Sequence, residues 1–118
     1  IFYPCIIQEV FFKELKPLLL NVVDGFNVCI FAFGPTGTGK TFTMMGDGSM
    51  KNWGLAPRMI ERIFQLTKKI YNEGVTSSLS MEMFEVYNEK IKGLIDMDEG
   101  EEIQSHKINN VKEAYDYL

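Results

Sequence analysis

A glycine-rich segment that directly follows an apolar run constrains this chain more than any other feature. The apolar run covers residues 26–33, and the segment after it has the pattern G-x-x-x-x-G-K-T. Its residues are Gly34, Pro35, Thr36, Gly37, Thr38, Gly39, Lys40 and Thr41. Between a buried strand and the start of a helix, this pattern is typical of a loop that cradles phosphate groups. The sequence therefore predicts a phosphate loop preceded by a strand of a parallel sheet.

Each residue type in this loop suits the binding of a nucleoside triphosphate. Backbone N–H groups of the loop and of the first helical turn lack intrachain partners, so they can converge on an anion. Gly37 and Gly39 permit positive φ and a close backbone approach. Lys40 would reach the β- and γ-phosphates, and the Thr41 hydroxyl would ligate Mg²⁺. Pro35 removes one N–H and fixes φ, which would either weaken the cradle or, as we expect, stiffen the loop. The alternative is a glycine-rich turn with a solvated lysine.

Composition limits the class of protein. The chain has 118 residues, of which 46% are hydrophobic, and a net charge of −4. It is therefore at most one domain and too apolar for wholesale disorder. The acidic balance argues against nucleic-acid binding, which needs clustered Lys and Arg. No apolar stretch reaches the roughly 18 residues of a membrane span.

The cysteines and the histidine do not suggest a metal site. Cys5 and Cys29 lie far apart in the sequence, and Cys29 falls in the predicted buried strand. We expect both to be reduced thiols in the core of a cytosolic protein. Neither Cys has a second ligand at a spacing typical of metal sites, and His106 lies alone in a polar stretch.

Helical patterns occur in several parts of the chain. Apolar residues recur every three or four positions in the two long segments, which predicts amphipathic helices. The predicted helical ranges are 8–23, 40–44, 57–73 and 111–118. Asp24-Gly25 and Gly74 should end the two long helices, and Pro17 should kink the first. Residues 46–54 have the composition of an exposed loop, in which Trp53 either anchors the loop or, less favoured, covers a bound nucleotide.

The strand signal lies in the second half of the chain. Residues 75–87 alternate between apolar and polar side chains, at least at first, which predicts a strand. Asn88-Glu89 should turn the chain into a short apolar patch at residues 91–95. The acidic residues that follow are expected to be solvated, with a divalent-metal role as the weaker alternative. These are Asp96, Asp98, Glu99, Glu101 and Glu102.

Residues 24–44 run from D-G-F-N-V-C-I-F-A-F-G to G-K-T-F-T-M and closely resemble the kinesin motor domain. The resemblance continues through residues 54–58 with the following 63–64, through 84–91, and more loosely through 111–114, so it covers nearly the whole chain. It implies an α/β fold of the P-loop NTPase type, with a central, mostly parallel sheet flanked by helices. It also implies ATP and Mg²⁺ at the phosphate loop, microtubules (tubulin) as partner, and a cytoplasmic, cytoskeletal location. The sequence of residues 28–44 further resembles that of the C-terminal-motor kinesins of plants.

The chain also departs from the family pattern. The family's R-x-R-P, S-S-R-S-H and D-L-A-G-S-E segments do not occur in these residues, so residues 1–118 resemble a partial motor domain. The missing segments hold the metal-associated and water-positioning groups, and we expect no ATP turnover by this chain alone. Pro35 stands where the family usually has Gln, and Gly93 where it commonly has Asp. The stretch between Ile95 and Val111, which helps the family touch microtubules, is also short.

Two further expectations concern assembly and behaviour. No heptad pattern is sustained, so dimerisation would depend on coiled-coil segments outside this chain. An incomplete sheet would expose strand edges and an apolar face, which predicts poor solubility. The alternative function is a truncated or diverged binding module that lacks ATP turnover and motor activity.

Overall fold

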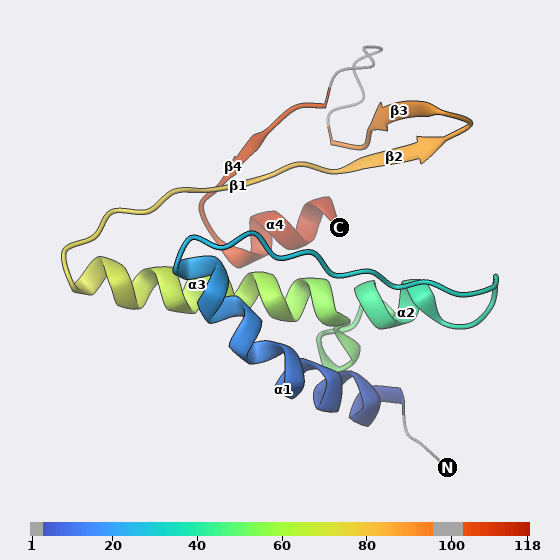
Figure 1. Ribbon diagram of the computed structural model, residues 1–118, viewed down its shortest axis with the longest axis horizontal. Helices are drawn as coiled ribbons and strands as arrows, with labels where there is room; N and C mark the ends of the chain where they lie inside the picture. The colour runs from blue at the N-terminus through green and yellow to red at the C-terminus, as the bar shows by residue number, and fades with distance from the viewer. Residues whose placement is uncertain (1–3, 96–102) are drawn as a thin grey trace. The chain divides into compact units, whose positions relative to one another are not determined.

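The computed structural model describes residues 4–95 and 103–118 (Figure 1). In chain order, the elements are α1 (Pro4–Val23), α2 (Lys40–Met45), the 3₁₀ helix η1 (Met50–Asn52), α3 (Leu55–Asn72), β1 (Leu79–Met81), β2 (Phe84–Tyr87), β3 (Lys90–Gly93), β4 (His106–Ile108) and α4 (Val111–Tyr117). The contacts divide the chain into two compact units, which are residues 1–75 with Leu118 and residues 76–117. The predicted acidic run at residues 96–102 lies outside the described residues.

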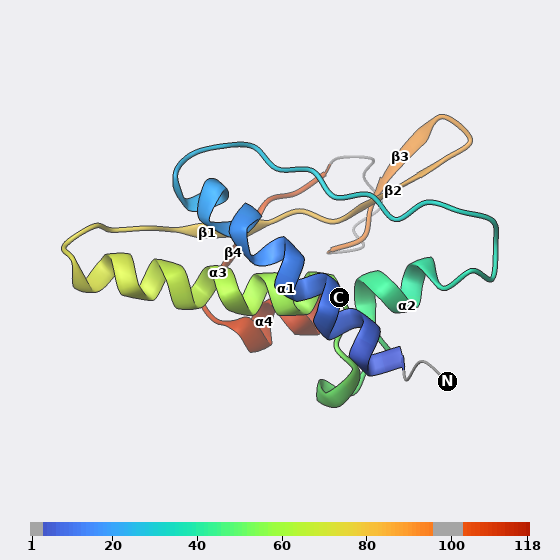
Figure 2. The same ribbon diagram turned by 60° about the horizontal axis from the view of Figure 1, so that its bottom comes forward.

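The first unit is built on the packing of α1 against α3 (Figure 2). Leu19 of α1 has none of its surface exposed, and Leu55 at the start of α3 is 5% exposed. Helix α1 begins at Pro4, earlier than the predicted start at residue 8, and continues through Pro17 as one element to Val23. None of the helices in the described ranges combines the length and apolarity needed to span a bilayer.

Both long helices end at the glycine that the sequence indicates. After α1, the Gly25 amide donates to the Val22 carbonyl at 3.1 Å and the Phe26 amide to the Asn21 carbonyl at 2.9 Å. After α3, the amides of the two residues that follow Glu73 donate to Tyr71 and Ile70 in the same pattern, at 3.0 and 3.3 Å. Both glycines have positive φ, near +90°, which completes the hydrogen-bonding arrangement known as a Schellman motif. The predicted stops are confirmed.

Residues 26–33 do not form the predicted buried strand. They are extended but belong to no strand, and Phe31 and Phe33 are 81% and 92% exposed. A strand of a parallel sheet needs neighbouring strands for its backbone groups, and the described residues place none beside this run. The expectation of a buried Cys29 is wrong for the same reason, since this free thiol is exposed. The side chain of Cys5 lies outside the described part of the structure.

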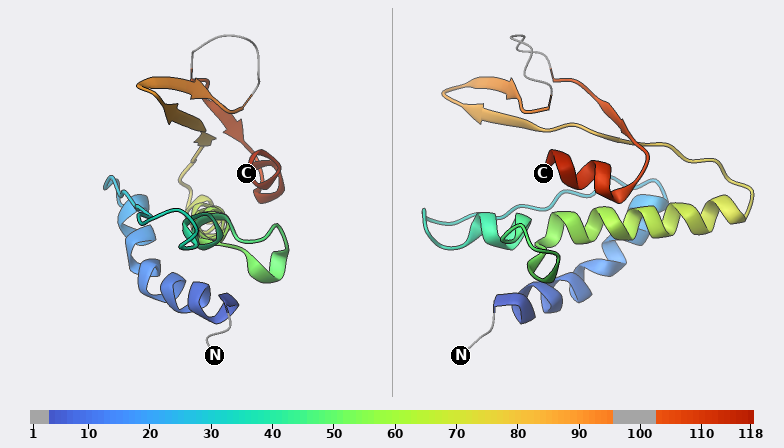
Figure 3. Two further views of the ribbon diagram at one scale, coloured as in Figure 1. Left: turned by 90° about the vertical axis from the view of Figure 1, so that its right-hand side faces the viewer. Right: turned by 180° about the vertical axis from the view of Figure 1, so that it is seen from behind.

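The second unit contains two antiparallel pairs of strands (Figure 3). Strand β1 pairs with β4, with Leu79 opposite Ile108, and β2 pairs with β3, with Val86 opposite Ile91. Within the described residues the strands form only these two-stranded sheets, so a central parallel sheet is not seen. The predicted strand over residues 75–87 is thus confirmed only in its later part, as β1 and β2.

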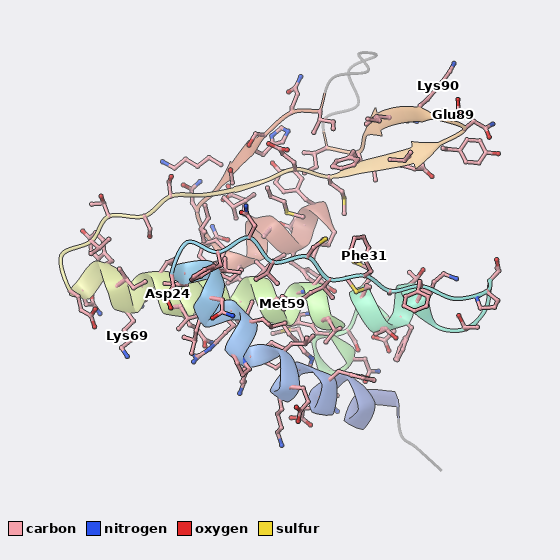
Figure 4. All side chains as sticks on the ribbon, in the orientation of Figure 1. Asp24, Phe31, Met59, Lys69, Glu89 and Lys90 are labelled. Atoms are coloured by element: carbon pink, nitrogen blue, oxygen red, sulfur yellow. The ribbon has the colours of Figure 1, made fainter. Side chains whose placement is uncertain are left out.

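The turn between β2 and β3 is the one that the sequence predicts. Asn88 and Glu89 have φ of +48° and +61°, as a two-residue hairpin turn of type I′ requires. Figure 4 shows Glu89 and Lys90 at the tip of this hairpin. Turn chemistry is local, which is why a single pair of residues is enough to predict it.

Helix α4 also begins at a local signal. The Asn110 side-chain oxygen accepts a hydrogen bond from the Glu113 amide at 2.9 Å, and the Glu113 carboxylate accepts one from the Asn109 amide at 2.8 Å. The Asn110 side chain thus caps the first turn of α4, and the Glu113 carboxylate bonds to the residue before the cap. Ala114 is 1% exposed, and the His106 ring of β4 lies 5.6 Å from the Tyr117 ring of α4. The predicted C-terminal helix is confirmed.

Candidate phosphate-binding site

The glycine-rich loop connects the extended segment to α2, as the motif predicts. Gly37 and Gly39 have φ of +83° and +94°, and Gly39 is the residue that precedes the first turn of α2. A Cβ atom at either position would meet nothing within 4 Å. Glycine is therefore favoured here by the left-handed backbone, and the space above both residues is open.

Pro35 has a part in this loop that the sequence does not indicate. Its carbonyl oxygen accepts hydrogen bonds from the Thr38 hydroxyl at 2.7 Å and from the Thr38 amide at 3.4 Å. The same oxygen accepts from the Lys40 ammonium at 2.7 Å. The proline thus closes the loop through its carbonyl group, although its nitrogen carries no hydrogen.

The Lys40 side chain folds back over the loop. Its ammonium donates to the Gly34 carbonyl at 2.6 Å as well as to the Pro35 carbonyl. An ammonium has three N–H donors, so these bonds leave one for another acceptor. The positive charge is therefore held at the loop, which is the position that the motif requires.

The start of α2 adds backbone donors next to this charge. The first hydrogen bond of the helix runs from the Thr43 amide to the Gly39 carbonyl at 2.9 Å. The amides of Lys40 and Thr41 precede it, and the described part of the chain supplies no acceptor for either of them. The Thr41 side chain is exposed. An ammonium, two available amides and a hydroxyl thus lie within a few residues of one another, and this donor set suits a phosphorylated ligand.

The loop after α2 is more ordered internally than its composition predicts. The Asp47 carboxylate accepts hydrogen bonds from the Ser49 amide, the Ser49 hydroxyl and the Asn52 side chain, at 2.9, 2.6 and 2.5 Å. These bonds lower the pKa of Asp47, the Ser49 hydroxyl most of all. Sequence reasoning missed this cluster, although an Asp in a glycine-rich loop commonly accepts a hydrogen bond from the backbone amide two residues later.

Trp53 lies at the end of that loop and is half-buried. Its carbonyl accepts a hydrogen bond from the Arg58 Nε of α3 at 2.8 Å, and its backbone forms a bridge with Gly46. These backbone contacts hold the end of the loop, whereas anchoring by the Trp53 ring stays a prediction. Helix α3 begins at Leu55, so Pro57 occupies the third helical position and not the first. Pro57 remains within the first turn, where an amide hydrogen is not needed.

Comparison with known proteins identifies the family. The family model described as the kinesin motor domain matches residues 1–115. The chain belongs to the kinesin motor domain family. The kinesin-like protein KIN-14M of Arabidopsis thaliana is 44% identical over 96 residues, which cover 80% of this chain and 13% of that protein. KIN-14D of Oryza sativa subsp. japonica is 41% identical over 97 residues, which cover 80% of this chain and 10% of that protein.

Solved structures agree with this assignment. The motor domain of the Kar3-like kinesin from Ashbya gossypii superposes with a TM-score of 0.80 at 30% identity. The match covers 93% of this kinesin chain and 38% of that one. A mutant kinesin motor ATPase gives a TM-score of 0.75 at 34% identity, and the match covers 88% of this chain and 36% of that one. The KIN-14 relatives confirm the resemblance to C-terminal-motor kinesins.

A dedicated metal centre is not found within the described ranges. They hold no group of three or more His, Cys, Asp or Glu side chains that could bind a metal ion.

Proposed function

We propose that residues 34–41 bind Mg·ATP, and that the chain is the ATP-binding part of a motor that couples ATP hydrolysis to movement along microtubules. The observation that carries this proposal is the placement of the Lys40 ammonium on the same loop as the available amides of Lys40 and Thr41. Membership of the kinesin motor domain family supports the choice of ATP over other anions.

Each part of the phosphate loop would have a separate role in binding the nucleotide. Lys40 would neutralise charge on the β- and γ-phosphates by exchanging its bonds to the Gly34 and Pro35 carbonyls for bonds to phosphate oxygens. Gly37 and Gly39 would let the backbone approach the phosphates closely. The Thr41 hydroxyl would hold Mg²⁺, which when bound supplies charge neutralisation between the phosphates.

Residues 1–118 would then form part of a motor domain whose sheet is completed elsewhere. The chain spans 10–13% of the KIN-14D and KIN-14M proteins named above and 36–38% of the two solved motor chains. We propose that a central, mostly parallel sheet includes residues 26–33 when its neighbouring strands are present. Turnover and microtubule binding would likewise need residues outside this chain, and the protein would work on cytoplasmic microtubules as a dimer formed through those residues.

Binding of a fluorescent ATP analogue to the full-length protein tests the site. We expect Lys40→Ala to abolish binding, because the loop then lacks its positive charge. Lys69→Ala removes an exposed lysine of α3 and serves as the matched control (Figure 4). Equal binding by the Lys40→Ala and Lys69→Ala proteins would contradict the assignment. Binding without microtubule-stimulated turnover would instead favour the alternative of a diverged, non-motor module.

A further inference from the structure

One carboxylate accepts side-chain and backbone hydrogen bonds across the loop that joins α2 to α3. We call residues 46–54 the clasp loop. All three hydrogen bonds of the Asp47 side chain stay within it, two from Ser49 to Oδ1 and one from Asn52 to Oδ2. Hydrogen bonds to an ionised acceptor are stronger than bonds between neutral groups. Asp47 therefore holds both halves of the clasp loop together.

The two ends of the clasp loop meet at the C-terminal end of α2. Gly46 and Trp53 form an antiparallel bridge, and the Gly54 amide donates to the Met45 carbonyl at 3.2 Å. A Cβ atom at Gly54 would collide with the backbone of Met44, and one at Gly46 with the carbonyl oxygen of Asn52. The backbones are thus in direct contact, and closure of the loop is transmitted to the helix without side chains between them.

Helix α2 depends on such contacts because it is short. It has six residues, and isolated helices shorter than about 12 residues are marginal in water. Its N-terminal end has no side-chain cap. At its C-terminal end, the Phe42 and Met45 carbonyls accept bonds from the amides of Gly46 and Gly54 at 2.9 and 3.2 Å. The clasp loop therefore supplies the helix with much of its support, and Arg58 ties the loop to α3.

We propose that Asp47 is a positioning residue for the nucleotide site, because closure of the clasp loop holds α2, and α2 carries Lys40 and Thr41. The inference rests on the proposed function of residues 34–41. It extends that function to a carboxylate outside the loop, which acts through the backbone of α2 and touches no ligand.

The test compares two aspartates in the full-length protein. Asp47→Ala removes the three hydrogen bonds of the Asp47 carboxylate and leaves the backbone bridge between Gly46 and Trp53 in place. Asp24→Ala is the matched control, because Asp24 also precedes a glycine, lies exposed in the same unit, and makes no side-chain hydrogen bond within the described residues. Figure 4 shows Asp24 at the end of α1. Asp47→Asn keeps one acceptor for Ser49, so it should retain part of the loop closure that Asp47→Ala loses.

Two readouts separate positioning from a purely local role. Amide exchange at Thr43, which makes the first hydrogen bond of α2, should accelerate about five- to tenfold in Asp47→Ala, as expected for the loss of a capping interaction. Affinity for a fluorescent Mg·ATP analogue should fall by about the same factor, with Asp24→Ala unchanged in both. Should Asp47→Ala fail to fold, Asn52→Ala removes only the bond to Oδ2 and should give about a two- to threefold effect.

The outcomes distinguish the inference from the function beneath it. Faster exchange confined to residues 47–52, with Thr43 exchange and analogue affinity unchanged, would overturn the positioning role and leave the nucleotide site intact. No analogue uptake by the wild-type protein would overturn the proposed function and, with it, the role of Asp47 in nucleotide binding. Parallel loss of Thr43 protection and of affinity, partly restored in Asp47→Asn, would support the inference.

Discussion

Two neighbouring segments of the first unit differ in what they need in order to fold. Residues 26–33 are strongly apolar, yet they are extended and expose Phe31 and Phe33. Residues 34–54 are richer in glycine and polar side chains, yet they form a closed loop, a helix and a second closed loop. The second segment finds its hydrogen-bond partners within a few residues, whereas a strand needs partners from elsewhere in the sequence. Apolar character alone therefore does not bury a segment.

The most severe test of the closed segment is Gly46→Ala. A methyl group there would collide with the Asn52 carbonyl oxygen, and φ of Gly46 is +87°, so the residue would be both crowded and strained. We expect a loss of about 3 kcal/mol or more, measured by urea denaturation. The control is Gly48→Ala, where φ is +88° but nothing lies within 4 Å of the added atom. Its cost should be about 1–2 kcal/mol. Equal losses would mean that the close backbone contact is not needed.

Acid should also open the clasp loop, with a smaller effect on stability than that of Gly46→Ala. The bonds to Asp47 lower its pKa from the ordinary value of 3.8, so their contribution is complete above that value and is lost as pH falls through the lower, folded-state pKa. We expect Trp53 fluorescence to remain constant from pH 7 to near pH 4 and to change only below it. The measurement uses a protein in which Trp53 is the sole tryptophan. A transition at pH 5 that persists in Asp47→Asn would show that another group holds the loop.

The smallest effect on stability is expected in the open segment. Phe33 is 92% exposed, so Phe33→Ser should change the free energy of unfolding by less than about 0.5 kcal/mol while reducing aggregation of the 118-residue chain. Light scattering and urea denaturation measure the two quantities. In the full-length protein the same substitution should be clearly destabilising, because we propose that the segment is covered there. A similar loss in both settings would remove the contrast between the two segments.

The parts of the fold that were predictable are those with local signals. The apolar stripes of α1 and α3 and the glycines that end them lie within one segment each, as does the Asn88-Glu89 turn. The start of α3 was less well predicted, because Gly54 precedes the helix without a side-chain cap. Burial of Val28 to Phe33 was wrong, because pairing depends on strands that no local pattern reveals.

The site was predictable to a similar degree. The motif was sufficient to place a loop with positive φ at Gly37 and Gly39 before a helix that starts at Lys40. The role of the Pro35 carbonyl could not be predicted, since the direction of a backbone carbonyl follows from the folded loop and not from the residue type. The Asn52 contact to Asp47 spans five positions of irregular backbone and belongs to no regular period.

Calorimetric titration of the full-length protein with Mg·ATP tests the central claim most directly. The account predicts saturable heat from one site, which is lost in Lys40→Ala and weakened in Asp47→Ala. No binding heat in the wild-type protein, or the same heat after Lys40→Ala, would contradict the claim that residues 34–41 hold the nucleotide.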